Sequence, residues 1–489
     1  MAGLGFALER MTQGRSLTST AGAYVYAALL VAGPWIFTVL AIGGIDLAAC
    51  PTDDCPGLPL FRSVIIYNAL ISAILTGPIA FVCTRFVSDQ VWLKRDTSVT
   101  YAFVVAQGLF AAVALLVAGP LYLFAADLPG PDTVAGLQNL LLMGAAWLLI
   151  PFMGAIRSHV IVAVAFGAGA AVMVALIAIA PSSEPLRLLT AFNIGLTVID
   201  LVLARRLLQE YGLGLVPDAA LARTLRTHWD LPLIGLTCAL GLWVDKLIMW
   251  FAAPVGVTTA GGAFRTMPNY DTPMFWAQLA SIPILAVFFV HVETNFFRLS
   301  RAFYGSLAHG VSRRDLARMQ ARLSRFVMAK LFGLFVALAA VALIAILVSY
   351  VAIEPLGLRA SQMGILRAAL VGMVFQTSSS FCFIFLLYFD LRRHALAVSA
   401  TYCVLNGTLT AALLPLGFPF FGYGNLLASA LTFLLAVLIL AHELPWLHFH
   451  AFITNNTSLD ASRRPAECPD RPDRPGRRGF RLRSRSRDG

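Results

Sequence analysis

The chain has 489 residues, of which 59% are hydrophobic and only 12% are charged, and its formal net charge is +11. A soluble domain averages about 45–50% apolar and about 25% charged residues, so this composition excludes a soluble globular protein. The positive charge would suit a nucleic-acid-binding protein, but the Lys and Arg residues fall in loops and in the tail, where membrane orientation explains them, and we expect no nucleic-acid partner.

The apolar residues gather in runs that are each long enough to cross a hydrocarbon core of about 30 Å as a helix. These runs do not alternate polar with apolar residues as barrel strands do, and helices satisfy their own backbone hydrogen bonds in lipid. The predicted spans are 22–47, 63–84, 101–126, 135–155, 159–180, 186–208, 230–253, 272–293, 327–352, 364–388, 394–416 and 422–444. We therefore predict an all-α polytopic membrane protein with about twelve transmembrane helices.

The first apolar run, 22–47, is too long for a cleavable signal peptide and lacks a small-residue cleavage site, so we expect it to stay in the membrane. Cys50 and Cys55 follow it and flank four residues, Pro51 to Asp54. Two cysteines are too few ligands for zinc. They form a candidate disulfide if this loop faces an oxidising compartment, and free thiols otherwise.

Basic residues alternate between the two sides of the predicted spans. They precede the first span and follow the second, fourth, sixth, eighth and tenth, whereas the intervening loops hold one Lys or Arg or none. Loops rich in Lys and Arg stay in the cytoplasm. The pattern predicts a protein of the bacterial inner membrane with both termini in the cytoplasm. It places Cys50 and Cys55 on the opposite, outer side of the membrane.

The loop 209–229 divides the chain into two halves, which predicts an N-terminal six-helix lobe over 1–208 and a C-terminal six-helix lobe over 230–450. The longest loop between spans covers about 295–326, and its segment from Asp315 to Arg325 suits an amphipathic surface helix. Residues 451–489 are rich in Arg and Pro and cannot bury a core, so we predict a disordered cytoplasmic tail.

Patterns of catalysis are missing from the sequence. It holds no Walker loop, no His-Glu-x-x-His, no paired Cys-x-x-Cys and no Gly-x-Ser-x-Gly. We therefore expect no enzyme, no metal and no cofactor.

Ionisable residues inside apolar spans are the best candidates for a transport site, because each is expensive in lipid unless it faces the bundle interior or a wet cavity. Asp245 and Lys246 stand side by side in the span 230–253. Adjacent residues point about 100° apart on a helix, so we expect them not to pair well with each other. They either line a cavity or form salt bridges to another helix.

Asp200 is the second such residue. Arg205 and Arg206 are five and six positions further along the span, whereas helical neighbours are three or four apart, so neither should share its face. Asp200 therefore needs a partner on another helix, or water. Glu293, at the end of the span 272–293, is a third candidate, although it can equally mark the cytoplasmic end of the helix.

Uncharged polar and aromatic residues also cluster in the spans. Sugars need ring faces for stacking and partners for their hydroxyl groups, and aromatic residues beside amides supply both. The candidates of this kind are Tyr67, Asn68, Trp276, Gln278 and Gln376, and the span 63–84 also carries a predicted break at Gly77-Pro78. The alternative reading for each is ordinary hydrogen bonding between helices.

Several short motifs, in their order and spacing, resemble those of the PelG family of the multidrug/oligosaccharidyl-lipid/polysaccharide flippase superfamily. They are Met1 to Phe6, Gly33-Pro34-Trp35, Thr84 to Asp89, Val244-Asp245-Lys246, Asp271 to Met274, Val292-Glu293-Thr294 and Gly422-Tyr423-Gly424. The resemblance covers roughly residues 1–445 and does not extend to the Cys50–Cys55 loop or the Arg-rich tail.

The resemblance implies two six-helix lobes around a central cavity and export of a Pel-like exopolysaccharide for the biofilm matrix. It also implies a PelF-like cytosolic glycosyltransferase and PelD-like and PelE-like membrane subunits as partners, with a cyclic-di-GMP sensor among them. The alternatives are a flippase for a lipid-linked oligosaccharide, a drug/cation antiporter of the same superfamily, and a membrane-embedded transferase. Ion coupling through Asp200 or Asp245 and pushing by polymer synthesis both remain open as energy sources.

Overall fold

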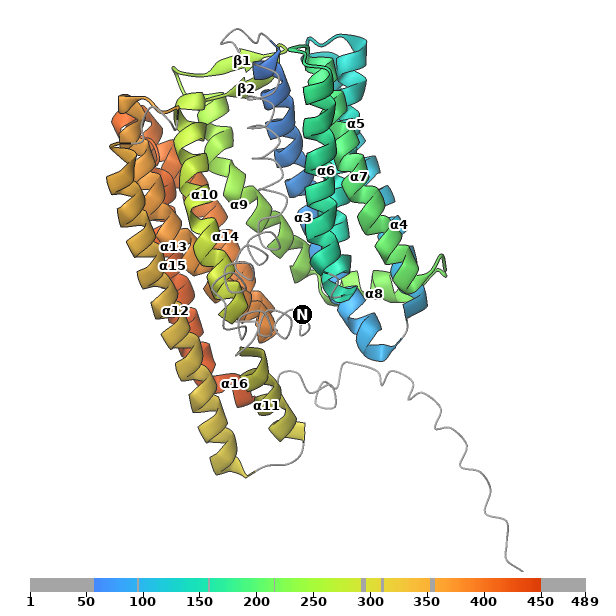
Figure 1. The fold of residues 1–489 in the computed structure, drawn as a ribbon. Coiled ribbons are helices and arrows are strands. Elements are labelled where there is room, and N and C mark those ends of the chain that lie inside the picture. The colour runs from blue at the N-terminus through green and yellow to red at the C-terminus, as the bar shows by residue number, and fades with distance from the viewer. Residues whose placement is uncertain are drawn as a thin grey trace, which may run out of the picture.

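The computed structural model describes residues 57–94, 96–156, 159–214, 216–291, 296–308, 312–351 and 357–449. Helices dominate this part of the chain, and one small antiparallel hairpin accompanies them (Figure 1). The long helices are α3 (Leu58–Leu93), α4 (Val99–Pro120), α5 (Gly130–Ile156), α6 (His159–Ile179), α7 (Pro185–Tyr211), α9 (Asp230–Ala252), α10 (Pro268–His291), α12 (Arg313–Ser349), α13 (Met363–Tyr388), α14 (Arg392–Leu413) and α15 (Tyr423–Glu443).

Shorter elements join the long helices. A π-helical turn, η2 (Leu121–Ala125), follows the end of α4. The 3-10 turns are η1 (Asp96–Ser98), η4 (Ala360–Gln362), η5 (Leu414–Leu416), η6 (Phe418–Phe420) and η7 (Leu444–Trp446). The short helices are α8 (Ala219–Thr227), α11 (Phe297–Ala308) and α16 (Leu447–Phe449). Strands β1 (Thr258–Ala260) and β2 (Phe264–Thr266) pair with Thr258 opposite Thr266 and Ala260 opposite Phe264.

Ten helices in the described ranges are long and apolar enough to cross a membrane, which confirms the predicted polytopic all-α fold. They correspond to the predicted spans from 63–84 to 422–444 except 272–293, which falls on α10. The predicted span 22–47 lies outside the described residues. Since α5 ends at Ile156 and α6 begins at His159, the fourth and fifth spans are separate helices.

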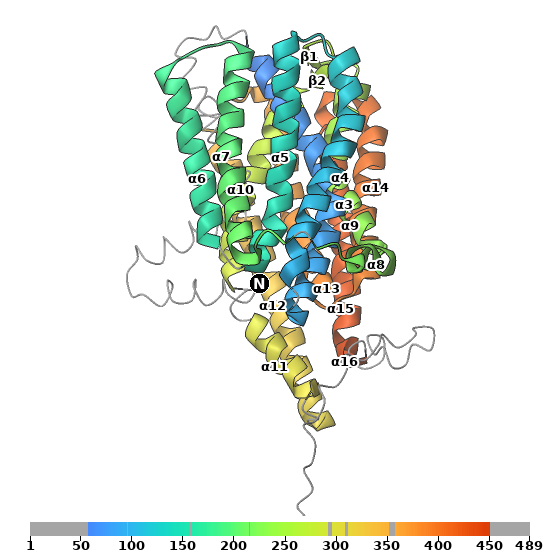
Figure 2. The ribbon, with the colours of Figure 1, turned by 90° about the vertical axis from the view of Figure 1, so that its right-hand side faces the viewer.

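The helices form two bundles with matching internal contacts. In the first lobe, α3 packs on α5, and α7 packs on both α5 and α6; in the second lobe, α10 packs on α13, and α15 packs on both α13 and α14. Figure 1 shows the two groups side by side, with α3 and α9 between them, and in Figure 2 the first group lies in front of the second. The same set of contacts occurs twice in the chain, as expected of a transporter built from structural repeats.

The two lobes meet where α3 crosses α9, and we call this contact the lobe seam. Gly77 and Gly235 lie at the crossing: a Cβ built on Gly235 would stand 2.3 Å from the Gly77 carbonyl oxygen, and one built on Gly77 would stand 2.7 Å from the Gly235 carbonyl oxygen. Only residues without a side chain permit backbones to approach so closely, as is common between membrane helices. The seam therefore has a contact point made of bare backbone.

The predicted break at Gly77-Pro78 is wrong, because α3 continues through both residues from Leu58 to Leu93. Proline inside a helix removes one backbone hydrogen bond, but membrane helices tolerate this when neighbouring groups satisfy the freed carbonyl. The flexibility of Gly77 is used here for the close approach to Gly235 and not for a bend that ends the helix.

The predicted surface helix at Asp315–Arg325 is also wrong. This segment forms the first turns of α12, which runs without interruption for 37 residues from Arg313 to Ser349. Ser312 caps the start of α12, where its hydroxyl oxygen accepts a hydrogen bond from the Asp315 amide. The separate helix in this loop is α11, which precedes α12 and packs against it. Helix α12 therefore extends past the bundle as a rigid rod (Figure 1).

Candidate functional site

The β1–β2 hairpin joins α9 to α10 and folds over one end of the lobe seam. Tyr67 of α3 fixes it there: the Tyr67 hydroxyl donates to the Arg265 carbonyl at 2.9 Å and accepts from the Arg265 amide at 3.0 Å. The Asp127 amide of the first lobe donates to the Gly261 carbonyl at 3.0 Å. A hairpin that belongs to the second lobe thus bonds to the first lobe, and it brings the start of α10 next to the end of α9.

A group of polar and aromatic side chains lies beneath this hairpin. We call it the hairpin cluster, and it consists of Tyr67, Asp245, Lys246, Trp250, Tyr270 and Asp271. These residues come from α3, α9 and α10. The cluster therefore includes both lobes.

Asp245 and Lys246 pair with each other, which corrects the expectation that they would not. The Lys246 ammonium nitrogen lies 3.4 Å from both carboxylate oxygens of Asp245. It also donates to the Leu242 carbonyl at 3.1 Å, one turn earlier, and lies 5.7 Å from the centre of the Trp243 ring. The 100° angle between adjacent residues applies to the Cβ atoms, and the four-carbon stem of lysine is long and flexible enough to curl back across it.

Asp245 has a second partner on another helix. The Tyr270 hydroxyl of α10 donates to an Asp245 oxygen at 2.8 Å. Asp245 has no solvent exposure, Tyr270 is 1% exposed and Lys246 is 8% exposed. The carboxylate is thus held by one ammonium and one hydroxyl in a dry site.

Asp271 binds the end of α9 to the start of α10. Its carboxylate accepts from the Trp250 indole N–H at 2.9 Å and from the Met267 amide at 2.9 Å. An acid in the first turn of a helix also interacts favourably with the helix dipole. The Trp250 ring in turn stacks on Tyr67, with centroids 5.1 Å apart and planes at 21°. Hydrogen bonds and ring contacts therefore connect Asp271 to the first lobe through two aromatic rings.

The hairpin cluster combines two acids, one ammonium and several aromatic rings. Five of its six residues are buried in this structure, and Asp271 is partly exposed. A substrate can reach Asp245 only if α10 or α3 moves away from α9. The cluster is thus closed in this structure, and a relative movement of the two lobes would break its contacts with Tyr67 of α3.

Asn68 lies outside this cluster, in a polar network of the first lobe. Asn68 is fully buried and its amide nitrogen donates to the Gly136 carbonyl and to Asn139 Oδ1, both at 2.9 Å, while its oxygen accepts from the Tyr122 hydroxyl at 2.8 Å. Asn139 continues the chain to Asn193 at 2.8 Å. These amides hold α3, α5 and α7 together, so Asn68 serves the structure of the first lobe.

Asp200 lies on α7, away from the hairpin cluster. Both of its carboxylate oxygens are buried and have no hydrogen-bond partner within the described ranges. Arg206 pairs with Glu210 at 2.9 Å instead, in agreement with the helical spacing. A salt bridge from Asp200 to another helix is therefore not found among these residues.

Trp276 and Gln278 on α10 and Gln376 on α13 are half-buried. The Gln278 and Gln376 backbone carbonyls accept hydrogen bonds from Ser281 and Ser380. Glu293 and the cysteine pair Cys50 and Cys55 lie outside the described residues. Among the residues described, no group of three or more His, Cys, Asp or Glu side chains could hold a metal ion.

The sequence interpretation missed Trp250, Tyr270 and Asp271. Asp271 begins one of the motifs that carry the family resemblance, but nothing in its spacing places it beside α9. Trp250 sits among ordinary apolar residues in the sequence, and Tyr270 stands between Asn269 and Asp271 at the edge of a predicted span. Only the hairpin, which reverses the chain between residues 252 and 268, brings the three together.

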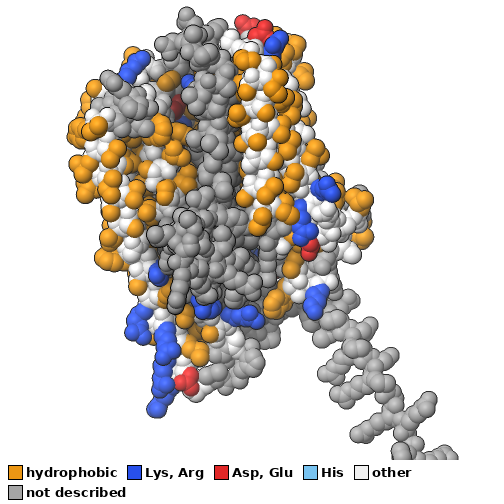
Figure 3. Space-filling view, in the orientation of Figure 1, with side chains coloured by type: hydrophobic (Ala, Val, Ile, Leu, Met, Phe, Trp, Pro, Cys, Tyr) orange, Lys and Arg blue, Asp and Glu red, His pale blue; other side chains and the backbone are white. Residues whose placement is uncertain are grey.

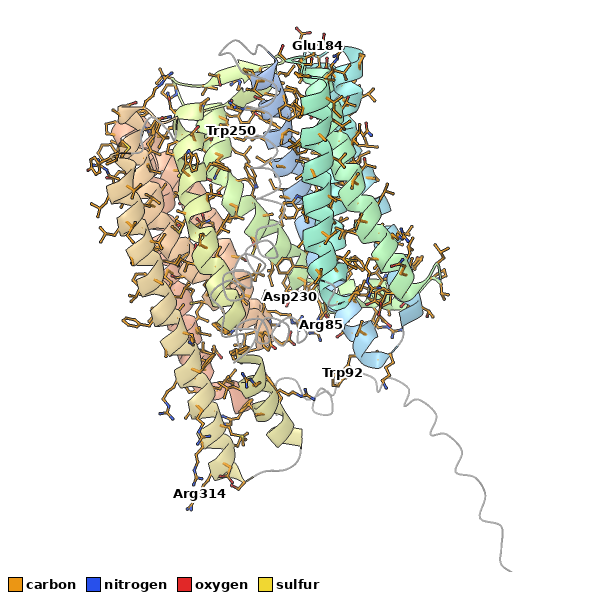
Figure 4. The ribbon with its side chains drawn as sticks, viewed as in Figure 1. Arg85, Trp92, Glu184, Asp230, Trp250 and Arg314 are labelled. Carbon is orange, nitrogen blue, oxygen red and sulfur yellow. The ribbon has the colours of Figure 1, made fainter. Side chains whose placement is uncertain are left out.

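A second polar group lies at the opposite end of the lobe seam. We call it the arginine chain, and it consists of Asp89, Arg85, Asp390, Arg392 and Asp230 in order of contact. Figure 4 shows Arg85 and Asp230 together at this end, far from Trp250. The consecutive N···O distances are 3.2, 3.5, 3.1 and 3.0 Å. Arg85 belongs to the first lobe and Asp390 to the second, so the chain joins the lobes.

Two features shape the arginine chain. Asp390 has φ of +57°, a left-handed conformation that Asp and Asn tolerate better than most residues. The ring of His228 lies 2.6 Å from an Arg392 nitrogen. Burial, together with the positive charges of Arg392 and Arg85, lowers the pKa of His228 below its ordinary value, and Asp390 and Asp230 oppose this only in part. The sequence interpretation used Arg85 and Arg392 for topology and did not recognise their contact.

Comparison with known proteins supplies a family and a fold. Residues 1–452 match the family described as "PelG: Putative exopolysaccharide Exporter (EPS-E)". No match was found among curated proteins.

Solved transporters share the fold at low identity. An outward-facing multidrug resistance MATE family transporter of the MOP superfamily has a TM-score of 0.57 and 13% identity, with 91% of this chain and 97% of that chain covered. An inward-facing one has a TM-score of 0.53 and 14% identity, with 91% and 98% covered. A MOP superfamily transporter from Pyrococcus furiosus has a TM-score of 0.57 and 12% identity, with 91% and 97% covered.

Proposed function

We propose a function for this chain from one premise, that it belongs to the PelG family of exopolysaccharide exporters. The chain is a multi-pass membrane protein with a transporter fold, and the family makes a polysaccharide its cargo. The finer proposal is export of a Pel-like exopolysaccharide from cytoplasm to periplasm, across the bacterial inner membrane, for the biofilm matrix. The alternating basic loops support this orientation.

Two rival functions are less well supported. A flippase for a lipid-linked oligosaccharide or a drug/cation antiporter would share the fold, but the family match over residues 1–452 favours a polymer exporter. A membrane-embedded transferase would need catalytic motifs, which the sequence lacks. We therefore propose that the chain catalyses no reaction, that a PelF-like glycosyltransferase supplies the polymer, and that PelD-like and PelE-like subunits are partners in the membrane.

The proposed mechanism is a rocking of the two lobes about the seam. The Gly77–Gly235 contact is the natural pivot because bare backbone there offers no interlocking side chains. The hairpin cluster and the arginine chain close the seam at its two ends. Separation of α3 from α9 would uncover the Tyr67 and Trp250 rings as stacking surfaces beside Asp245, which we propose as an acceptor for sugar hydroxyls.

Asp245 provides the direct test. Asp245→Asn keeps the side-chain volume but removes the charge and leaves Lys246 without its ion-pair partner; an unpaired charge at a helix centre costs about 2.5–3.5 kcal/mol on insertion scales. We expect normal membrane insertion and sharply reduced polysaccharide secretion, measured by immunoblot of the membrane fraction and by assay of extracellular carbohydrate. Glu210→Gln, on the exposed face of α7, is the matched control and should export normally.

A double variant separates transport from stability. Asp245→Asn with Lys246→Met removes both charges and leaves no unpaired ion. If Asp245 only neutralises Lys246, the double variant regains export. If the carboxylate takes part in transport, export stays low at normal protein level. Normal export by Asp245→Asn alone would contradict the proposed role of the hairpin cluster.

A further inference from the structure

A stripe of exposed arginines follows the part of α12 that extends past the bundle. We call it the arginine stripe, and it consists of Arg314, Arg318, Arg322 and Arg325. Their spacing of four, four and three residues places them along one face of the helix. All four side chains are exposed, and Figure 3 shows Lys and Arg side chains along the lower end of α12, on the side that faces away from the bundle.

The opposite face of the same segment is anchored. Gln320 is 7% exposed, and its amide nitrogen donates to the Leu444 carbonyl at 3.1 Å and to the Pro445 carbonyl. The His448 ring nitrogen lies 2.8 Å from the Gln320 oxygen. Leu323 is fully buried nearby. The stripe is therefore held rigidly, and the direction in which it points is set by the packing of its other face.

The stripe reaches well beyond the lipid. The apolar part of α12 begins at about Val327. At about 1.5 Å per residue, Arg318 lies about 13 Å and Arg314 about 20 Å before that point. The headgroup region on each side of a bilayer is about 5–8 Å thick, so even a helix tilted by about 40° would carry Arg314 roughly 15 Å past the hydrocarbon edge. Figure 4 shows Arg314 far beyond Trp92, whose side chain is 87% exposed, as at an interface.

One acid on the same segment already pairs with the stripe, because the Asp315 carboxylate lies 3.2 Å from Arg318 and both side chains are exposed. The other acids on this side of the protein do not suit the stripe. Residues 451–489 follow α16 and hold ten arginines against five acids, so that segment would be repelled. Asp89, Glu210, Asp230 and Asp390, which face the same side, each already pair with an arginine of the chain. A second copy would bring the same pairs. Among the described residues, the acids therefore neutralise only Arg318, and we look to another macromolecule for the charge that complements Arg314, Arg322 and Arg325.

We propose that the arginine stripe is a docking surface for an acidic face of a cytoplasmic protein. Single exposed ion pairs contribute little. Arg314, Arg322 and Arg325 lie along one face of a straight helix together with Arg318, whose charge Asp315 offsets in part, and their joint field steers an acidic partner toward the membrane. Charge complementarity of this kind determines partner choice and association rate more than it raises affinity. The inference concerns a different surface from the hairpin cluster and stands independently of the transported substrate.

The test uses the full chain in nanodiscs of phosphatidylcholine, with fluorescent poly-L-glutamate as a probe for an acidic protein face. The variant is Arg314→Gln, Arg318→Gln and Arg322→Gln. The control, Arg205→Gln, Arg223→Gln and Arg226→Gln, removes three exposed arginines, one near the end of α7 and two on α8. We expect about tenfold weaker binding for the stripe variant, as three lost contacts would give, and less than a threefold change for the control.

Two outcomes would overturn the proposal. Equal losses in the stripe variant and the control would show that poly-L-glutamate senses net charge and not the stripe. Repetition in nanodiscs with phosphatidylglycerol tests lipid as the occupant: if anionic headgroups abolish the difference between wild type and stripe variant, the stripe lies on the membrane surface. A difference that persists in both nanodiscs supports a protein partner. Thermal unfolding of each variant checks that the fold is intact.

Discussion

The two ends of the lobe seam are closed by different chemistry. The hairpin cluster is dry, with Asp245 fully buried, and uses hydrogen bonds and stacked rings as well as one ion pair. The arginine chain is made almost entirely of ion pairs, and the side chains of its cross-lobe contact, Arg85 and Asp390, are 37% and 33% exposed. Water and salt screen exposed pairs, whereas a buried pair that loses one partner leaves a costly unpaired charge.

This difference indicates which end opens more easily. Breaking the arginine chain exchanges weak ion pairs for water, so it costs little. Breaking the hairpin cluster uncovers a buried acid, an ammonium and aromatic surface together. The end with the arginine chain, on the predicted cytoplasmic side, should therefore open and close readily. The hairpin end should open only when a substrate or a lobe movement compensates for the lost contacts.

The largest effect should come from the contact between the two ends. Gly235→Leu places a side chain where even a Cβ would stand 2.3 Å from the Gly77 carbonyl, so α3 and α9 must move apart and both ends of the seam lose their alignment. Overpacking of this kind costs about 1–3 kcal/mol or more. We expect a marked fall in thermal stability in detergent and loss of export.

Gly108→Leu on α4 is the matched control, since a Cβ there meets nothing within 4 Å. It should leave thermal stability and export close to those of the wild type. If Gly235→Leu behaves in the same way, the seam is not the tight backbone contact that the structure describes.

A smaller effect should come from the cross-lobe pair of the arginine chain. Arg85→Gln and Asp390→Asn, alone and together, form a double-mutant cycle, and Asn keeps the tolerance for positive φ at position 390. We expect a coupling free energy of about 0.2–1 kcal/mol that shrinks in high salt. Export should change, because the pair joins the lobes.

The equivalent cycle of Arg206→Gln and Glu210→Gln probes an ion pair of 2.9 Å within the first lobe. It should give a similar coupling energy without any change in export. A change in export from both cycles would mean that general surface charge, and not the contact between lobes, governs transport.

The smallest effect should be the pH response of His228. Its pKa is lowered in the folded chain by burial and by Arg392, so the folded state binds protons less readily than the unfolded state. The stability that this provides is fully present above the ordinary histidine pKa of about 6.5 and is lost as the pH falls below it. We expect His228→Gln to flatten the acid side of the stability profile below about pH 6.5.

His442→Gln, at an exposed histidine of α15, should leave the profile unchanged. The measurement is the thermal midpoint of the purified chain against pH. Identical profiles for the wild type and His228→Gln would show that His228 does not influence this end of the seam.

Hydropathy and family motifs determined the class of the protein from the sequence alone. Runs of apolar residues are sufficient evidence for spanning helices because no other local structure satisfies the backbone in lipid. The order of short motifs over residues 1–445 identified a family that the match over residues 1–452 confirms. Periodicity also excluded Arg205 and Arg206 as partners of Asp200, because that argument concerns one helix only.

The tertiary structure decided everything that depends on contacts between helices. Arg85 and Asp390 are 305 positions apart, and the spacing of residues along a helix carries no information about such a pair. Tyr270 and Asp271 join Asp245 and Trp250 only because the hairpin reverses the chain. The sequence at Gly77 predicts a helix break, whereas in the structure Gly77 is the residue at which α3 contacts Gly235 of α9, in the other lobe. Local rules fix the directions of neighbouring residues, while the packing of the two lobes decides which of those directions meet.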